Sequence, residues 1–230
     1  MAVSFTLLLT GLASTTNQST AYTGTAGTCA SQDLLIAFIS TSGNTTAGTM
    51  TGGALTWTLL TSQTKNVGAD ICSVFWAFAT TGVSVTPSYT PSAAATGCII
   101  SVIRVAGSTA TTLSPNLQQT TATATGTTAN PTVTFGTATL TDNGLLLLIA
   151  NGTNSTTQFT APTGFTELEE LAYNTPANAG ETAARVSGGT ATTYTWTNAN
   201  TTSWRSFGLE FVASVSTSFD PMGMMGFYGL

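Results

Sequence analysis

Two continuous apolar runs constrain the fold of this chain more than any other feature. Residues 33–40 read Asp-Leu-Leu-Ile-Ala-Phe-Ile-Ser, and residues 142–150 read Asp-Asn-Gly-Leu-Leu-Leu-Leu-Ile-Ala. An apolar run of this length between turn residues is typical of a strand that is buried on both faces, although length alone leaves a short buried helix open. Because both runs occur in similar settings, we predict an internal duplication with repeats of about residues 1–110 and 111–215.

Further strand-like segments accompany both runs in a similar order. They cover residues 53–60, 71–78, 83–90 and 97–105 in the first half, and residues 130–141, 162–168, 183–187, 192–196 and 204–213 in the second. Alternation in residues 53–60 predicts that Leu55, Trp57 and Leu59 share one face. Helix signals are confined to residues 169–173, one turn at most.

Many short strands separated by Gly, Pro and Asn predict an all-β fold. We expect a jelly-roll-like β-sandwich over residues 1–215, built from two four-strand halves. Two separate small sandwiches are the alternative, but the join at residues 108–130 does not have the composition of a linker.

The first residues could be mistaken for a signal peptide. They read Met-Ala-Val-Ser-Phe-Thr-Leu-Leu-Leu-Thr, without a basic residue before a short apolar run, whereas secretory signals have a basic start and a longer apolar core. We therefore predict a first β-strand here. No run approaches the roughly 18 apolar residues of a membrane-spanning helix.

The scarcity of charge excludes several kinds of partner. Charged residues make up 6% of the 230 residues, and only four of them are basic. Nucleic acids and anionic membranes are bound by several Lys or Arg acting together, so the sequence predicts neither partner. The 52 threonines suit exposed strand faces. A surface with so little charge tends to associate, which favours a protein that functions within an assembly.

The three cysteines and the three arginines are expected to be structural. A disulfide framework needs a larger, even number of cysteines, whereas only three are present, Cys29, Cys72 and Cys98. Free buried thiols are favoured over a bridge between Cys72 and Cys98. The arginines lie in or beside core strands, where structural pairing with a carboxylate is expected, with Glu210 or Glu181 as candidates. These arginines are Arg104, Arg185 and Arg205.

Few residues suggest catalysis. The chain has no histidine, which removes the usual catalytic triad and most zinc sites. It also lacks a phosphate-binding glycine loop and a dinucleotide fingerprint. Glu167 and Glu169 are expected on one strand face, where a glycosidase pair, or a calcium site with Glu170, competes with a solvated edge. We favour the edge, and therefore predict no catalytic, cofactor or metal site.

The composition changes beyond Ser216. Residues 216–230 are rich in glycine and contain a proline, which disfavours a regular element. They also contain large apolar side chains that are poor choices for a solvated tail. We predict an extended tail that docks on a neighbouring subunit, with folding back over its own sandwich as the alternative. The contact residues would be Phe219, Met222, Met224, Met225, Phe227, Tyr228 and Leu230.

Four motifs resemble those of the β-sandwich structural proteins of tailed phages. They are Asp-Leu-Leu-Ile-Ala-Phe (33–38), Gly-Gly-Ala-Leu-Thr-Trp (52–57), Val-Phe-Trp-Ala-Phe-Ala (74–79) and Pro-Thr-Gly-Phe-Thr (162–166). The resemblance covers roughly residues 3–213. It implies a non-enzymatic component of the virion, either a capsid decoration protein or a tail-associated adhesin, and it implies no catalytic residues.

These observations predict a homo-oligomeric decoration (cement) protein that contacts the capsid or sister subunits. One alternative is a carbohydrate- or receptor-binding module of a phage tail or cell-surface adhesin, with Trp57, Trp196 or Trp204 as an exposed aromatic platform. The other is a self-assembling extracellular fibre subunit. No cofactor is predicted.

Overall fold

Antiparallel strands form almost all of the regular structure in the computed structural model, which confirms the all-β prediction. The structure describes residues 3–64, 69–107, 111–151, 156, 158–198 and 203–213. The first half contains β1 (Ser4–Leu7), β2 (Leu12–Ser14), β3 (Tyr22–Thr23), β4 (Gly27–Cys29), β5 (Asp33–Ser42), β6 (Thr49–Thr51), β7 (Thr58–Thr64), β8 (Asp70–Ala79), β9 (Val83–Val85), β10 (Ser88–Thr90) and β11 (Gly97–Ala106). The second half contains the 3-10 turn η1 (Ser114–Asn116), β12 (Ala122–Gly126), β13 (Thr132–Thr134), β14 (Gly144–Asn151), β15 (Thr166–Asn174), β16 (Ala177–Arg185), β17 (Thr193–Thr195) and β18 (Trp204–Phe211).

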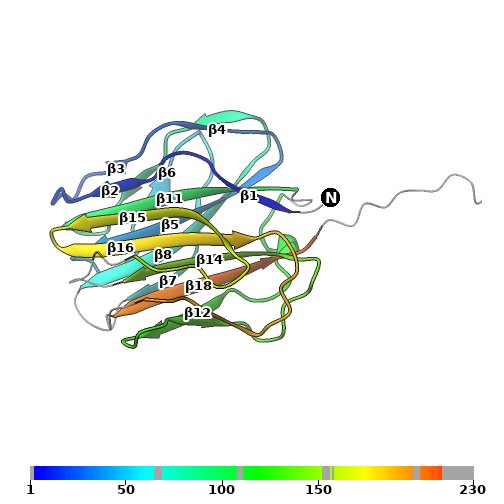
Figure 1. Ribbon diagram of the computed structural model, residues 1–230. Helices are drawn as coiled ribbons and strands as arrows, with labels where there is room; N and C mark the ends of the chain where they lie inside the picture. Colours follow the sequence, from blue (N-terminus) through cyan, green and yellow to red (C-terminus); the bar gives the residue numbers. More distant parts are fainter. Residues whose placement is uncertain are drawn as a thin grey trace, which may run out of the picture.

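Each half contributes one large sheet. The first sheet has the order β1-β11-β5-β8-β7, with β2 also paired to β11, and the second has the order β12-β18-β14-β16-β15 (Figure 1). The predicted buried runs, β5 and β14, lie at the centre of these orders. The sheets therefore have six and five strands, where four were expected in each half.

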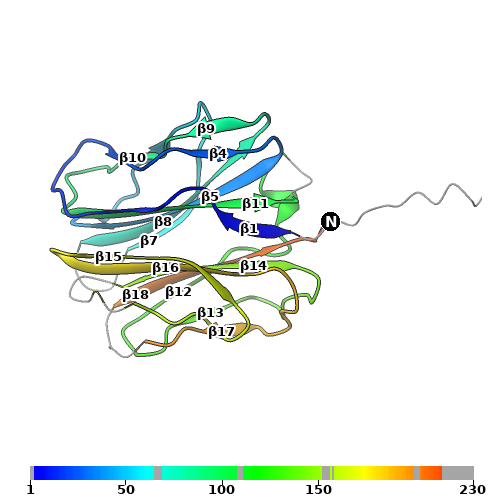
Figure 2. The same ribbon diagram turned by 45° about the horizontal axis from the view of Figure 1, so that its top comes forward.

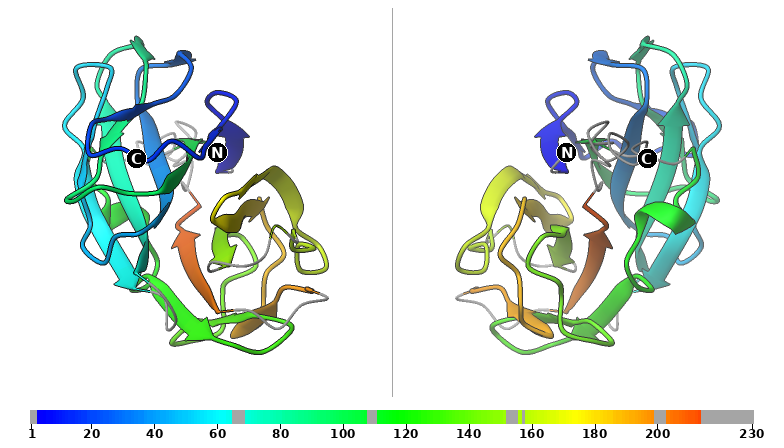
Figure 3. Two further views of the ribbon diagram at one scale, coloured as in Figure 1. Left: turned by 90° about the vertical axis from the view of Figure 1, so that its left-hand side faces the viewer. Right: turned by 90° about the vertical axis from the view of Figure 1, so that its right-hand side faces the viewer.

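The two large sheets pack face to face, and smaller sheets cover their outer faces. Figure 2 shows four layers: β4, β9 and β10 above, the two large sheets between, and β13 with β17 below. The end view in Figure 3 shows the two large sheets facing one another. The fold is thus a sandwich of large sheets with an additional thin layer on each side.

Three apolar clusters fill the spaces between these layers. The inner cluster joins both halves, with Ile36 and Phe38 of β5 meeting Leu148 of β14 and Phe207 of β18. Alternate residues of the same strands point outward into separate clusters under the small sheets, as Leu35 and Leu147 do. Every residue of β5 and β14 is buried, because both faces of these strands are covered.

Several predicted strands have different limits in the structure. The segment 53–60 is a turn followed by β7, which begins only at Thr58, and Leu59 is exposed rather than on a shared face with Leu55 and Trp57. Residues 83–90 form two short strands in different sheets. The helix signals at residues 169–173 produce no helical turn, because these residues belong to β15 and pair with β16.

The cysteines are free and buried, as predicted. Cys72 faces the inner cluster, whereas Cys98 faces the outer cluster of the same sheet. A sheet therefore separates the two sulfur atoms, which excludes a bridge between them.

Three buried tyrosines make the folded chain sensitive to alkali. The hydroxyl of Tyr22 donates to main-chain carbonyls, that of Tyr89 accepts from Gly48 N at 2.8 Å, and that of Tyr173 lies 2.9 Å from Ser42 Oγ. Burial raises the pKa of Tyr22 and of Tyr89 from 10.0 to about 12, and it raises the pKa of Tyr173 further. The folded state therefore retains these protons more strongly than the unfolded state.

We expect the stability to fall as the pH rises above 10. Below pH 10 both states keep the tyrosine protons, and the stabilisation is complete; it is lost as the pH rises through about 12, because only the unfolded chain ionises readily. Urea unfolding followed by circular dichroism across this range would measure the loss, and Tyr89→Phe should reduce it. A stability that stays constant between pH 10 and pH 12 would contradict the prediction.

Candidate functional site

The three arginines serve structural roles, but not with the predicted partners. Arg104 forms an ion pair with Asp33 on the outer face of the first sheet. Arg185 donates to the carbonyl oxygens of Ser187 and Gly188 at 2.8 and 2.5 Å. Arg205 is buried and donates to the carbonyl oxygens of Thr64 and Trp204, which ties the second sheet to β7 of the first.

Glu210 is a buried carboxylate whose hydrogen bonds come from uncharged groups. It accepts from Leu140 N at 2.7 Å, from Asn143 Nδ2 at 2.9 Å and from Gln119 Nε2. These contacts join the end of β18 to the loops before β12 and β14. The predicted pairing of Glu210 with an arginine is replaced by this network.

A cluster of three carboxylates lies where β15 pairs with β16. A β-bulge between Glu167 and Glu169 makes β15 advance by two residues while β16 advances by one. Glu167 therefore lies opposite Ala183, and Glu170 opposite Glu181, on the same face of the sheet. One oxygen from each of Glu167, Glu170 and Glu181 lies within 4.8 Å of the other two.

The bulge also overturns the prediction that Glu167 and Glu169 share a face. Glu169 points to the inner side of the sheet, where it accepts a hydrogen bond from Gly11 N at 2.5 Å and connects the two halves. Burial raises its pKa. A carboxylate pair made of Glu167 and Glu169 is therefore not formed, and Glu170 and Glu181 occupy the site with Glu167.

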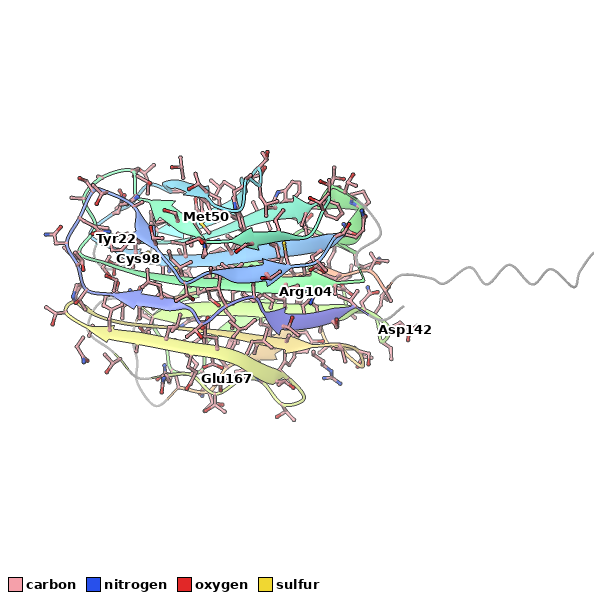
Figure 4. All side chains as sticks on the ribbon, turned by 90° about the horizontal axis from the view of Figure 1, so that it is seen from above. Tyr22, Met50, Cys98, Arg104, Asp142 and Glu167 are labelled. Atoms are coloured by element: carbon pink, nitrogen blue, oxygen red, sulfur yellow. The ribbon has the colours of Figure 1, made fainter. Side chains whose placement is uncertain are left out.

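The three carboxylates of the cluster differ in exposure. Glu167 is exposed, Glu170 is partly exposed, and Glu181 is 1% exposed. Burial raises the pKa of Glu181 to about 9, and the negative charges of Glu167 and Glu170 act in the same direction. Burial and the charge of Glu167 also raise the pKa of Glu170. The site thus brings three carboxyl groups together at the β15–β16 edge of the second sheet, and Figure 4 labels Glu167 on β15.

A groove opens along the other edge of the sandwich. Its volume is about 520 Å³, and it runs between the edge of the first sheet and the chain that leads into β12. Its apolar lining comes from Leu60, Trp76, Leu113 and Leu117, and its polar lining from Ser114, Gln119, Thr120 and Thr121. The sequence did not indicate that Trp76 lines a groove, because the residue pattern of its strand predicts only a core strand.

The three tryptophans that were predicted to form an exposed aromatic platform are buried or half-buried. Trp196 is fully buried and Trp204 is 5% exposed. Trp57 is half-buried, and its Nε1 donates to the Gly52 carbonyl oxygen at 3.2 Å. Of the four tryptophans, Trp76 is the one that lines the groove.

The predicted tail contacts lie outside the described residues. They are Phe219, Met222, Met224, Met225, Phe227, Tyr228 and Leu230. The described chain ends at Ala213, next to the groove, because Val212 N donates to Asn116 O at 2.9 Å and Leu117 pairs with Phe211.

Comparisons with family models, with curated proteins and with solved structures found no match. Among the described residues, no helix has the length and hydropathy needed to span a membrane.

Proposed function

We propose that this protein is a non-enzymatic structural component of a virion, a capsid decoration (cement) protein that assembles as a homo-oligomer. Its partners would be the capsid or sister subunits, reached through its low-charge surface and residues 216–230. The observation that carries this proposal is the groove and the two uncharged strands that border it.

Edge strands of a sheet present unpaired backbone groups that can pair with another chain, and soluble proteins usually protect them with charged side chains or proline. No charged residue or proline occurs in the edge strands β7 and β12. Their sequences are Thr-Leu-Leu-Thr-Ser-Gln-Thr and Ala-Thr-Ala-Thr-Gly. Both lie beside the apolar lining of Leu60, Leu113 and Leu117. An uncharged edge next to an apolar groove suits the addition of a strand or tail from a neighbouring subunit.

The place where the described chain ends adds to this argument. The last described residues, up to Ala213, lie beside η1 and Leu117, which form one wall of the groove. The methionines of the tail can adapt to an irregular apolar surface. A tail that starts beside a groove can occupy the groove of its own chain or the equivalent groove of a sister subunit.

Removal of residues 217–230 is expected to abolish binding to the particle or oligomerisation. The reason is that the main apolar contact segment of the chain would be lost, while the described sandwich is untouched. Light scattering after size exclusion would measure the oligomer, and co-sedimentation with capsids would measure particle binding. Val186→Ser, which removes an exposed apolar side chain from another part of the surface, is the control and should assemble normally. Unchanged assembly of the shortened chain would contradict the proposal.

A second candidate function is a carbohydrate- or receptor-binding module of an adhesin. The observation that favours it is Trp76 in the groove, with the amide of Gln119 and the hydroxyls of Thr120 and Thr121 nearby. An aromatic face beside hydroxyl and amide groups can stack on a sugar ring and bind its hydroxyls. A glycan array with the wild type and Trp76→Ala separates this function from assembly. A self-assembling extracellular fibre subunit would instead give filaments in electron micrographs of the purified protein.

We further propose that the two halves arose by internal duplication. Their strand orders correspond one by one: β1 with β12, β11 with β18, β5 with β14, β8 with β16, and β7 with β15. In both halves, a short sheet covers the outer face of the large sheet, which is the face turned away from the other half. The jelly-roll assignment stays a prediction.

A further inference from the structure

We propose that Glu167, Glu170 and Glu181 bind a calcium ion at the β15–β16 edge of the second sheet. This proposal is independent of the decoration function, and it concerns residues on the opposite edge from the groove. It is carried by two observations, the separation of the carboxylate oxygens and the lack of a partner for one buried carboxylate.

The separation of the oxygens suits a single ion. One oxygen from each glutamate lies within 4.8 Å of the other two. Ca²⁺ binds oxygen ligands at about 2.3–2.6 Å, so two oxygens on opposite sides of one ion are about 5 Å apart. The three carboxylates can therefore contact the same ion with only small side-chain adjustments. The register of β15 and β16 holds two of them, Glu170 and Glu181, directly opposite one another.

Glu181 differs from the other buried acids of the described chain. Asp33 pairs with Arg104 and accepts from Ala30 N at 2.6 Å, Asp70 accepts from Gly43 N at 3.1 Å, and Glu210 accepts three hydrogen bonds. The Glu181 side chain is 1% exposed, yet neither of its carboxylate oxygens has a hydrogen-bond partner of normal geometry among the described residues. The main chain of Phe159 and the carboxylate of Glu170 are close enough to influence its pKa, but neither completes such a bond.

A buried carboxylate without a partner is costly, and proteins normally pair it or bind it to a metal. Here the charged groups that act on it are two further carboxylates, which repel it. A divalent cation between the three would supply the missing partner and cancel most of the repulsion. Among the described residues, the alternative to a cation is a proton held on Glu181.

The ligand set favours calcium over other metals. All three ligands are carboxylates, which are hard oxygen donors, and the cluster contains no sulfur or imidazole for zinc or copper. Mg²⁺ demands a near-ideal octahedron and keeps several waters, whereas Ca²⁺ accepts irregular coordination by several carboxylates. Glu167 is exposed, which provides an entry path and room for water ligands.

The test is calcium titration of the full chain after treatment with a chelator. Isothermal calorimetry with CaCl₂ should show one site per chain, and thermal unfolding should shift to a higher midpoint with added calcium. Glu181→Gln should weaken calcium binding at least tenfold. Glu170→Gln provides the same test at a partly exposed position, should Glu181→Gln not fold. Glu169→Gln is the matched control, because it lies on the same strand but faces the other side and can still accept from Gly11 N.

Four results would overturn the proposal. They are no heat and no thermal shift with calcium, unchanged affinity in both Glu181→Gln and Glu170→Gln, equal loss in Glu169→Gln, and magnesium binding as tight as calcium binding. The absence of both heat and thermal shift with calcium would mean that a proton, and not a metal ion, neutralises Glu181. Unchanged affinity in both glutamine variants, or an equal loss in Glu169→Gln, would place any bound calcium elsewhere. Equally tight magnesium binding would remove the assignment to calcium.

Discussion

An Ile36→Asp variant is expected not to fold. Ile36 is 0% exposed and belongs to the inner cluster between the two large sheets, where it lies opposite Ile103 of β11 and Trp76 of β8. The side chains of that cluster are apolar and offer no partner for an aspartate. An unpaired buried charge costs several kcal/mol or more, and a typical domain has only about 5–15 kcal/mol of total stability.

Far-UV circular dichroism and size exclusion would show the loss of folded protein directly. Ile36→Val is the matched control at the same position, because it removes one methylene group and should cost about 1 kcal/mol. Leu59→Asp tests the charge itself, since Leu59 is 43% exposed on β7 and can keep an aspartate in water. A folded Ile36→Asp protein with normal stability would mean that β5 is not covered on its inner face.

The second large effect is expected from Gly52→Ala, with a loss of about 3 kcal/mol or more. Gly52 has φ of 130°, a backbone conformation that is essentially restricted to glycine and costs other residues about 1–3 kcal/mol. A Cβ atom at this position would also overlap the carbonyl oxygen of Thr86, which is backbone and cannot rotate away. The strain and the overlap add to one another.

The turn at Gly52 also orients neighbouring side chains. Its carbonyl oxygen accepts from Leu55 N at 3.3 Å and from Trp57 Nε1 at 3.2 Å, which holds both side chains against the outer cluster. Displacement of this turn would therefore expose apolar surface in addition to the local strain.

Urea unfolding of Gly52→Ala and Gly136→Ala would measure the effect against a matched substitution. Gly136 follows β13, and a Cβ atom there would meet only the Gln119 side-chain oxygen at 3.8 Å. Gly136→Ala should therefore change the stability by less than about 1 kcal/mol, with a small gain from the reduced entropy of the unfolded chain. Equal effects of the two substitutions would contradict the account of the turn.

The turn at Gly52 also explains why the sequence predicted this region incorrectly. Alternation in residues 53–60 is typical of a strand, but Gly52, Gly53 and Ala54 all have positive φ values. The chain therefore turns before β7 begins at Thr58, and Leu59 ends on the exposed side. Periodicity alone does not reveal a turn that starts within the pattern.

The candidate calcium site could not be predicted from the sequence for a related reason. Side chains alternate along a regular strand, so Glu167 and Glu169 were expected together. One additional residue in the bulge reverses this alternation and places Glu170 beside Glu167. The third ligand, Glu181, comes from the neighbouring strand, and only the register of β15 and β16 brings it into reach.

The sequence by itself determined the class of the fold and its central strands. Continuous apolar runs can be buried only when both faces of a strand are covered, and β5 and β14 are buried along their whole length for this reason. The scarcity of basic side chains is likewise a property of the sequence alone, and the prediction of no nucleic-acid partner depends on it and not on the fold. The tertiary structure alone decided how the two sheets face each other, which acids meet and where the groove opens, because these features depend on register, bulges and contacts between residues far apart in the chain.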